Sequence, residues 1–169
     1  MVQTVPGNDK PSFSLLAAVF DCASFDCGDD EEINSFVRDQ ALADHSMNRN
    51  QTRVLFFPGS NRIVGFITTS MGQVSLEIDG LPKRPVGCYH VAFLGVDKNY
   101  QHKGYGTQLL LFAIAEARRL ASEVGCRGVG LNCRDKRLAW YERKGFKCYG
   151  RRTDNRGALN MMFFDCRGP

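Results

Sequence analysis

The amino-acid sequence predicts a single α/β domain built around a mixed sheet. Its 169 residues, 43% hydrophobic and 24% charged, suit one folded core. Strand-like and helix-like segments alternate along it, and a strand–helix–strand unit lies near the centre. We expect residues 1–12, which are polar and contain two prolines, to form a flexible tail, and residues 13–169 to form the domain.

A short strand and a helix are expected first. The strand lies near residues 13–16. Asp29 and Glu32 have the spacing of a capping box, which predicts that a helix begins there. The helix should continue through apolar residues at helical spacing: Ile33, Phe36, Val37 and Leu42.

The sequence predicts β-strands in the middle of the chain. "TRVLFF" and "RIVGFITTS", separated by "PGSN", predict a hairpin, and "QVSLEI" prolongs its second strand. The segment "DGLPKRPVG" has two prolines and two glycines, so we expect an irregular loop. "CYHVAFLGV" is apolar almost throughout, which is typical of a strand buried on both faces.

The remaining elements are a long helix that follows "QHKGYG" and ends at Gly125, a central strand "GVGLNC", and a short helix "DKRLAWYERKG" that ends at Gly145. Two final strands, "GFKCYGRR" and "ALNMMFFD", are joined by the turn "TDNRG".

Several classes of protein are disfavoured. The seven cysteines form no Cys-x-x-Cys pair and we see no export signal, so we expect reduced thiols in a cytoplasmic protein. The three histidines are scattered, which gives no metal site. No apolar run approaches the roughly 20 residues that cross a bilayer. The net charge of +4 permits a nucleic-acid partner without requiring one.

The most specific motif is "QHKGYG", residues 101–106. Gly104 and Gly106 allow a tight turn, and the positive end of the next helix points at the same place, which suits a pyrophosphate. The P-loop pattern does not match, and the dinucleotide fingerprint would need glycine where Leu109 stands. A turn that only links strand to helix is the alternative, but the preceding buried strand favours binding.

Two motifs resemble the GNAT acyltransferases: "FLGVDKNYQHKGYGTQLL" resembles the cofactor turn and "WYERKGF" a later motif of that family. The resemblance extends over residues 13–166. It implies the GNAT fold, a mixed central sheet with helices on both faces, with acetyl-CoA as donor and an amine as acceptor. The cofactor-binding residues that it implies are Leu94, Gly95, Val96, Gln101, His102, Lys103, Gly104, Tyr105, Gly106 and Thr107.

"FDCGDDEEINSFV" and the block from "GLPKRPVG" to "KGYG" are similar to the GNAT toxins of type II toxin–antitoxin modules. This similarity implies acetylation of the α-amino group of aminoacyl-tRNA, which blocks translation, a ribbon-helix-helix antitoxin and a homodimer. The chain departs from the family pattern at Phe93, usually arginine, at Arg137, usually alanine, and at Trp140, usually phenylalanine.

The family motif implies that Tyr141 is the catalytic proton donor to the leaving thiolate. The alternative is a core tyrosine. No carboxylate stands on the apolar strand to act as a base. His90, which is more often a packed residue, and Glu77 are the other candidates. An aminoacyl ester has a comparatively acidic ammonium and needs a base less than lysine does.

Basic residues cluster near the C-terminus and in the proline-containing segment. We take Lys83, Arg84, Arg143, Arg151 and Arg152 as candidate RNA contacts, with an ordinary charged surface as the alternative. Two other functions remain open. One is a free-standing N-acetyltransferase of a small-molecule or protein amine, and the other is an acetyl-CoA-binding regulatory module.

Overall fold

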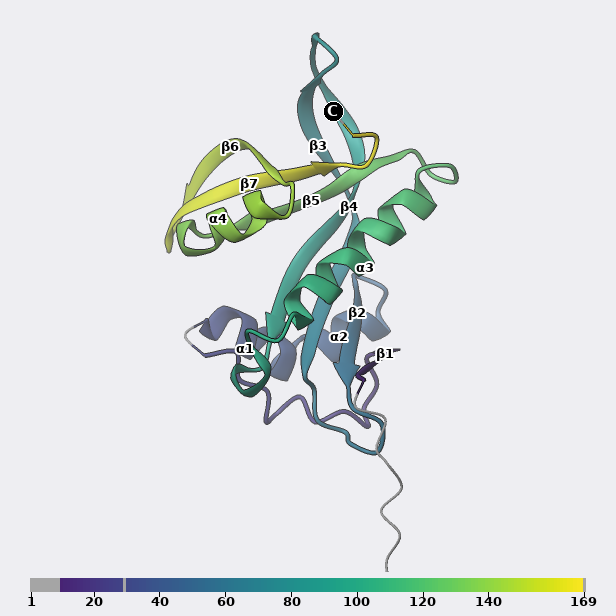
Figure 1. Cartoon of the computed structure of the whole chain (residues 1–169), viewed down its shortest axis with the longest axis vertical. Helices are drawn as coiled ribbons and strands as arrows, with labels where there is room; N and C mark the ends of the chain where they lie inside the picture. The colour runs from purple at the N-terminus through teal and green to yellow at the C-terminus, as the bar shows by residue number, and fades with distance from the viewer. Residues whose placement is uncertain (1–9, 29, 169) are drawn as a thin grey trace, which may run out of the picture. The chain divides into compact units, whose positions relative to one another are not determined.

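A computed structural model describes residues 10–28 and 30–168 (Figure 1). Asp29, part of the expected capping box, lies outside these residues. The strands are β1 (Ser12–Leu15), β2 (Gln51–Phe56), β3 (Gly65–Ile78), β4 (Leu81–Val96), β5 (Cys126–Cys133), β6 (Lys147–Asp154) and β7 (Gly157–Asp165). The helices are α1 (Glu31–Asp39), α2 (Ala41–Ser46), α3 (Tyr105–Leu120), α4 (Asp135–Arg143) and the 3-10 turn η1 (Lys98–Tyr100).

The strands form one hydrogen-bonded sheet in the order β1-β2-β3-β4-β5-β7-β6. The β4–β5 pair is parallel, while β1–β2, β5–β7 and β6–β7 are antiparallel. The predicted mixed sheet is therefore confirmed. Within the described residues, no helix is long and apolar enough to cross a membrane.

The chain divides into two compact units. The first comprises Met1–Thr68 and Phe93–Leu110, and the second comprises Thr69–Ala92 and Leu111–Pro169. The division runs through β3, β4 and α3, so each unit contains part of these three elements.

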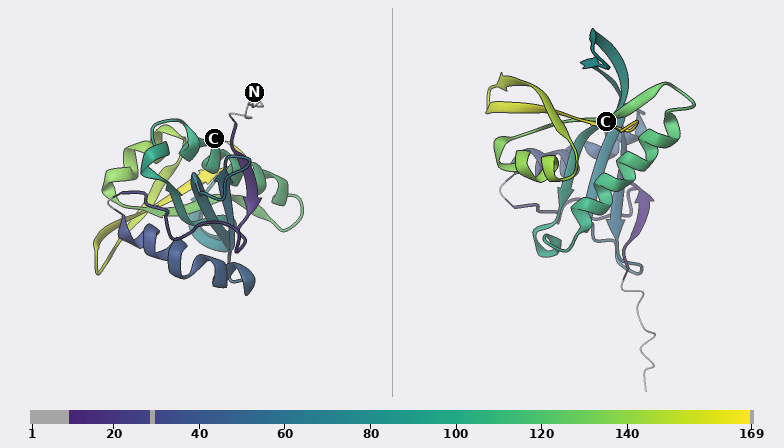
Figure 2. Two further views of the ribbon diagram at one scale, coloured as in Figure 1. Left: turned by 90° about the horizontal axis from the view of Figure 1, so that it is seen from below. Right: turned by 45° about the horizontal axis from the view of Figure 1, so that its top comes forward.

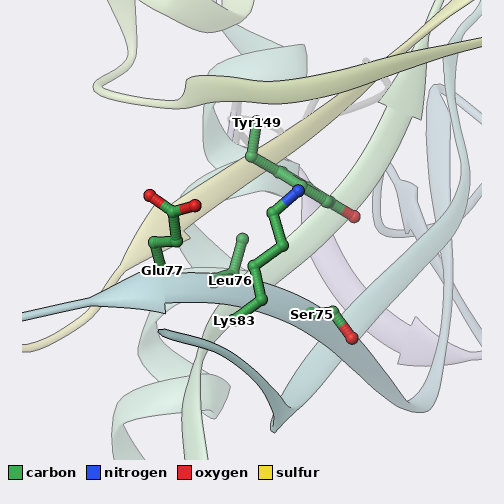
Figure 3. Close-up of a pocket in the computed structure, with 5 residues that line it drawn as sticks. All are labelled: Ser75, Leu76, Glu77, Lys83 and Tyr149. Carbon is green, nitrogen blue, oxygen red and sulfur yellow. The ribbon is translucent and has the colours of Figure 1, made fainter. Parts of the chain in front are cut away.

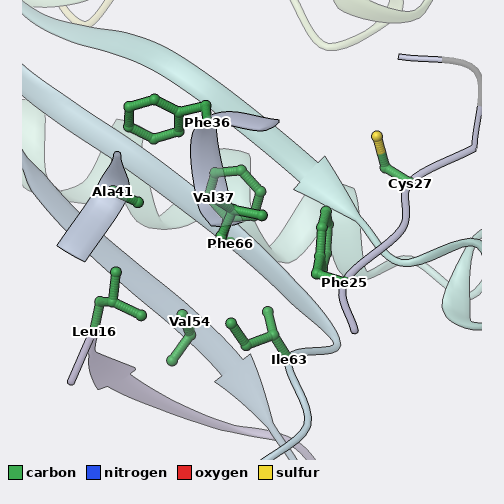
Figure 4. Close-up of a cluster of buried hydrophobic side chains, with 9 residues drawn as sticks. All are labelled: Leu16, Phe25, Cys27, Phe36, Val37, Ala41, Val54, Ile63 and Phe66. Carbon is green, nitrogen blue, oxygen red and sulfur yellow. The ribbon is translucent and has the colours of Figure 1, made fainter. Parts of the chain in front are cut away.

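The first unit has an aromatic core between its strands and α1 (Figure 4). Phe36 stacks on Phe93, with ring centroids 3.8 Å apart and planes 9° apart. The single helix expected to reach Leu42 is wrong, because the chain leaves helical geometry at Gln40 (φ −126°) and starts again as α2. The new direction buries Ala41 completely.

The expectation of an irregular loop over residues 79–87 is also wrong. Asp79 and Gly80 have φ values of 55° and 73°, as a type I′ turn requires, and they join β3 to β4 as a hairpin. Pro82 and Pro85 lie on an exposed stretch of β4, before its ladder with β5 begins at Gly87. A missing N–H is tolerated at such a sheet edge.

The second unit packs α4 against β7 and β6 (Figure 2). The β6–β7 pair contains a bulge between Cys148 and Gly150, which leaves Tyr149 as the extra residue. A small cluster of buried side chains, Leu76, Cys88 and Phe163, packs against partly buried neighbours that include Tyr149.

Candidate active site

The "QHKGYG" turn joins β4 to α3 through a strained stretch of backbone. His102 and Gly104 have φ values of 62° and 87°, in the left-handed region. The first helical bond of α3 runs from the Gln108 N–H to the Gly104 carbonyl. The amide groups of Tyr105 and Gly106 precede that bond and are free of intrahelical acceptors. They form the positive end of a helix, which binds anions well.

Space around Gly104 is open. A Cβ added there would have nothing within 4 Å, and His102 and Lys103 beside it are exposed. The Lys103 ammonium lies 3.2 Å from the Asn99 carbonyl and 5.5 Å from the centre of the Tyr100 ring. The turn therefore presents amide donors, a cation and room for a ligand, which fits the diphosphate of a coenzyme A.

A network of buried and partly buried polar groups lies next to this turn and supports it. Asp97, 1% exposed, accepts a hydrogen bond from the Asn99 N–H through Oδ1 and one from the Asp26 N–H through Oδ2. Lys98 donates its N–H to the Asp26 carbonyl and pairs its ammonium with the Asp26 carboxylate at 2.6 Å. Asn34, also buried, accepts from the Cys27 N–H at 2.8 Å.

Gln101 is tied into the same network. Its Nε2 donates to the Cys27 carbonyl at 2.8 Å and to the Val96 carbonyl at 3.0 Å. The side-chain NH₂ group of Gln101 therefore holds β4 to the "FDCG" segment.

The backbone of β4 leaves its parallel partner early. The ladder with β5 runs from Gly87↔Cys126 to Val91↔Leu131, and β4 continues beyond it to Val96. Gly95 is buried, and a Cβ there would meet Ile33 at 2.8 Å. Leu94, Gly95 and Val96 thus lie outside the β5 ladder, as a strand that pairs with an extended ligand must.

Tyr141 lies on the second turn of α4 and is 9% exposed. Its ring makes edge contacts with Trp140, at 4.8 Å between centroids, and with Phe146, at 5.7 Å. Burial raises the pKa of Tyr141 well above its usual value, the nearby Cys133 thiol adds to the rise, and Arg137 opposes it. The phenol therefore keeps its proton at neutral pH, as the predicted role of proton donor requires.

The start of α4 is held by a clamp of three residues, Asp135, Arg151 and Asn160. The fully buried Asn160 donates from Nδ2 to Oδ1 of Asp135 at 2.7 Å and to the Cys133 carbonyl at 3.3 Å. Arg151 donates to Oδ1 of Asn160 at 2.7 Å and to Oδ1 of Asp135 at 2.8 Å. The Asn160 bond lowers the pKa of Asp135 most, and Arg151 adds to this.

The acetyltransferase (GNAT) family model matches residues 16–146. The chain belongs to this family. The predictions of an acetyltransferase and of a GNAT fold are therefore confirmed.

Individual members of the GNAT family are similar to this chain in sequence or in structure. A tRNA-acetylating toxin of Mycobacterium tuberculosis (strain ATCC 25618 / H37Rv) is 29% identical over 127 residues, which cover 72% of this chain and 75% of the toxin. Among solved structures, a tyrosine-to-phenylalanine mutant of KacT has a TM-score of 0.80 at 20% identity, covering 94% of this chain and 96% of that one. AtaT complexed with acetyl-methionyl-tRNAfMet has a TM-score of 0.78 at 21% identity, covering 93% and 95%.

The expected RNA contacts differ in their surroundings. Lys83, Arg84, Arg143 and Arg152 are exposed. Arg151 is also exposed, but its guanidinium is engaged in the clamp. An RNA-binding role for these residues of the GNAT domain stays a prediction.

The two candidate bases, His90 and Glu77, differ in their burial. Burial lowers the pKa of His90, and the charge of Arg152 lowers it further, so this imidazole is neutral at pH 7. A Cβ added at Gly72 would lie 3.3 Å from the Cβ of His90, so a side chain at position 72 would crowd this histidine. Glu77 is exposed on the β3–β4 hairpin. Among residues 10–28 and 30–168, no group of histidine, cysteine or acidic side chains is arranged to hold a metal.

Asp26, Asn34 and Asn160 are the site residues that the sequence did not predict. Asp26 and Asn160 act through contacts with segments distant in sequence, such as the bond between the Asp26 N–H and Asp97, 71 positions apart, whereas Asn34 contacts the nearby Cys27, seven positions away. The only local signal was an asparagine in the apolar stripe of a helix, at position 34, and one among the apolar residues of β7, at position 160.

Proposed function

We propose that the protein uses acetyl-CoA to acetylate the α-amino group of aminoacyl-tRNA and thereby blocks translation. The observation that carries the proposal is the similarity to the mycobacterial tRNA-acetylating toxin over 72% of the chain. AtaT, which has the same fold, has been solved with acetyl-methionyl-tRNAfMet. Since charged tRNA serves translation in the cytoplasm, the proposal includes a cytoplasmic location.

Binding of the donor is assigned to the turn and to β4. Backbone amides at Gly104, Tyr105 and Gly106 would hold the diphosphate, and Lys103 would add positive charge. The backbone of β4 at Leu94 and Val96 would orient the extended arm of the cofactor. Acetyl-CoA supplies the activated acetyl group when it is bound. His102 and Thr107 flank the same turn and complete the expected contacts.

Tyr141 is assigned the proton that the leaving sulfur requires. Its raised pKa keeps the hydroxyl protonated, and the clamp fixes the helix that carries it. The acceptor needs little help from a base, because the ammonium of an aminoacyl ester is more acidic than that of lysine. His90, neutral at pH 7, would accept the proton of the acceptor amine if one must be removed.

Two partners follow from the proposal. AtaT has been solved bound to the C-terminus of its antitoxin AtaR and to acetyl-CoA, at a TM-score of 0.74 and 21% identity, covering 94% of this chain and 95% of that one. We therefore include a ribbon-helix-helix antitoxin, and a homodimer, in the proposal.

The decisive experiment incubates the protein with labelled acetyl-CoA and total aminoacyl-tRNA. Label should enter the RNA fraction and disappear after mild alkaline deacylation, which removes the acetylated amino acid. Polyamines and peptides tested in parallel separate this function from acetylation of a small-molecule or protein amine. Binding of acetyl-CoA with no acceptor at all would favour a regulatory module. In cells, induced expression should arrest growth, and Tyr141→Phe should relieve the arrest.

A further inference from the structure

A small open hollow in the second unit lies between the β3–β4 hairpin and β6 (Figure 3). Its volume is about 320 Å³, and its lining residues are Ser75, Leu76, Glu77, Lys83 and Tyr149. The lining combines the Leu76 side chain and the Tyr149 ring with a hydroxyl, a carboxylate and an ammonium. The proposed binding of acetyl-CoA and transfer of the acetyl group use none of these residues; Lys83 is one of the expected RNA contacts, and Glu77 was the second candidate base.

Tyr149 reaches this hollow because of the bulge in β6. Cys148 pairs with Met162 and Gly150 with Met161, so Tyr149 has no partner of its own on β7. A bulge re-aims the side chain of its extra residue. A Cβ at Gly150 would meet the terminal methyl of Met161 at 2.5 Å, so a larger residue there would require the Met161 side chain to move. The Tyr149 ring packs on the Leu76, Cys88 and Phe163 cluster, and it also lines the open hollow.

Two cations lie beside the hollow. Lys83 points toward Tyr149 in Figure 3. Arg152 is close enough to Tyr149 to affect its titration. Glu77 is the one acidic member of the lining. An aromatic face with cations beside it suits an unstacked nucleobase flanked by phosphates, and the polar groups of the lining suit the donors and acceptors of a base edge.

We propose that this hollow binds an unpaired nucleobase of the acceptor RNA, which stacks on Tyr149 while Glu77 and Lys83 contact its edge. The proposal rests on the proposed function, since it names how the RNA part of aminoacyl-tRNA is recognised. The side chain of the esterified amino acid is the competing occupant. Such a side chain lacks the phosphates that the cations beside the hollow would contact.

The test compares two acceptors, aminoacyl-tRNA and the methyl ester of the same amino acid, which lacks RNA. Tyr149→Ala should raise the KM for aminoacyl-tRNA about tenfold or more, because stacking on an aromatic side chain contributes roughly 1–3 kcal/mol per base. The kcat, the KM for acetyl-CoA and the rate with the methyl ester should not change. Tyr149→Phe keeps the ring and should behave as the wild type.

Glu77→Ala distinguishes a contact with the edge of the nucleobase from simple charge attraction. Because Glu77 is exposed, the substitution should leave the fold intact. Attraction alone predicts tighter RNA binding when a negative charge is removed, whereas a contact to the base edge predicts weaker binding. An unchanged or lowered KM in Glu77→Ala together with a normal KM in Tyr149→Ala would overturn the inference. Equal losses with the methyl ester would assign the hollow to the amino-acid side chain instead. If the wild type acetylates no aminoacyl-tRNA, the proposed function itself is wrong.

Discussion

Asn160, in the middle of β7, donates a 2.7 Å hydrogen bond to Asp135, the first residue of the helix that carries Tyr141. The N-terminal cap position of that helix, Arg134, makes no side-chain capping bond. The α4 helix is therefore positioned from the neighbouring strand and not by its own cap.

Asn160→Ala should consequently weaken both the fold and catalysis. Loss of a buried amide that makes three hydrogen bonds should lower the free energy of unfolding by about 1–3 kcal/mol. We expect kcat to fall more than the KM for acetyl-CoA, because the loosened element carries Tyr141. Urea unfolding and steady-state kinetics measure the two effects. Asn155→Ala, in the exposed β6–β7 turn, is the control and should change neither; equal falls in kcat for both variants would argue against the clamp.

Tyr141→Phe removes one oxygen atom and leaves the ring contacts with Trp140 and Phe146. Loss of a general acid typically costs 10²–10⁴-fold in rate, so we expect kcat to fall by roughly that factor. Calorimetry should give an unchanged affinity for acetyl-CoA. Because the pKa of Tyr141 is raised, kcat of the wild type should not decline through its ionisation up to about pH 9.5. Near-normal turnover of the variant would remove Tyr141 from the mechanism.

Gly104→Asp should abolish binding of acetyl-CoA, because its carboxylate would occupy the anion site at the start of α3. Gly59→Asp is a closely matched control. The two glycines have φ values of 87° and 86°, and a Cβ added at either would meet open space, so backbone strain is the same in the two variants. Calorimetric titration with acetyl-CoA should show binding in Gly59→Asp only. Equal affinities would exclude the turn as the anion site.

The lowered pKa of Asp154 predicts how the stability of the fold depends on pH. Hydrogen bonds from Arg134 lower its pKa to about 2 in the folded protein. A lowered pKa stabilises the fold above the pKa of the unfolded chain, near 4, and this contribution is lost as the pH falls toward 2. Asp154→Asn should therefore melt below the wild type at pH 7, with a difference that shrinks between pH 4 and 2. Exposed Asp39→Asn serves as the comparison in the same melting series.

Local signals in the sequence were sufficient for most of the elements and for the cofactor turn. Gly104 and Gly145 lie at the left-handed positions that their motifs implied. The hairpin at Asp79 and Gly80 was missed because two prolines outweighed a strong turn signal, and the prolines turned out to lie where β4 has no partner on its β5 side. The break at Gln40 has no glycine or proline to mark it; burial of Ala41 accounts for it.

The side-chain hydrogen bonds that support the site could not be predicted from local patterns in the sequence. The sequence placed Gln101 in the cofactor turn, but it did not reveal the bonds from the Gln101 amide to the carbonyls of Cys27 and Val96. The sequence marked Arg151 as a candidate RNA contact, but it did not reveal the bonds of Arg151 to Asp135 and Asn160. Such pairings depend on which strands meet in the sheet, and single-sequence periodicity carries no such information.

The stacked pair of Phe36 and Phe93 couples two positions that lie far apart in the sequence. Position 93, arginine in similar toxins by the resemblance of the motifs, is here half of an aromatic stack in the first unit. Replacing Phe93 alone by arginine would remove one ring of the stack and bring a charge beside the partly buried edge of the first-unit core. Positions 36 and 93 should therefore be exchanged together when segments of this chain are combined with those of its relatives.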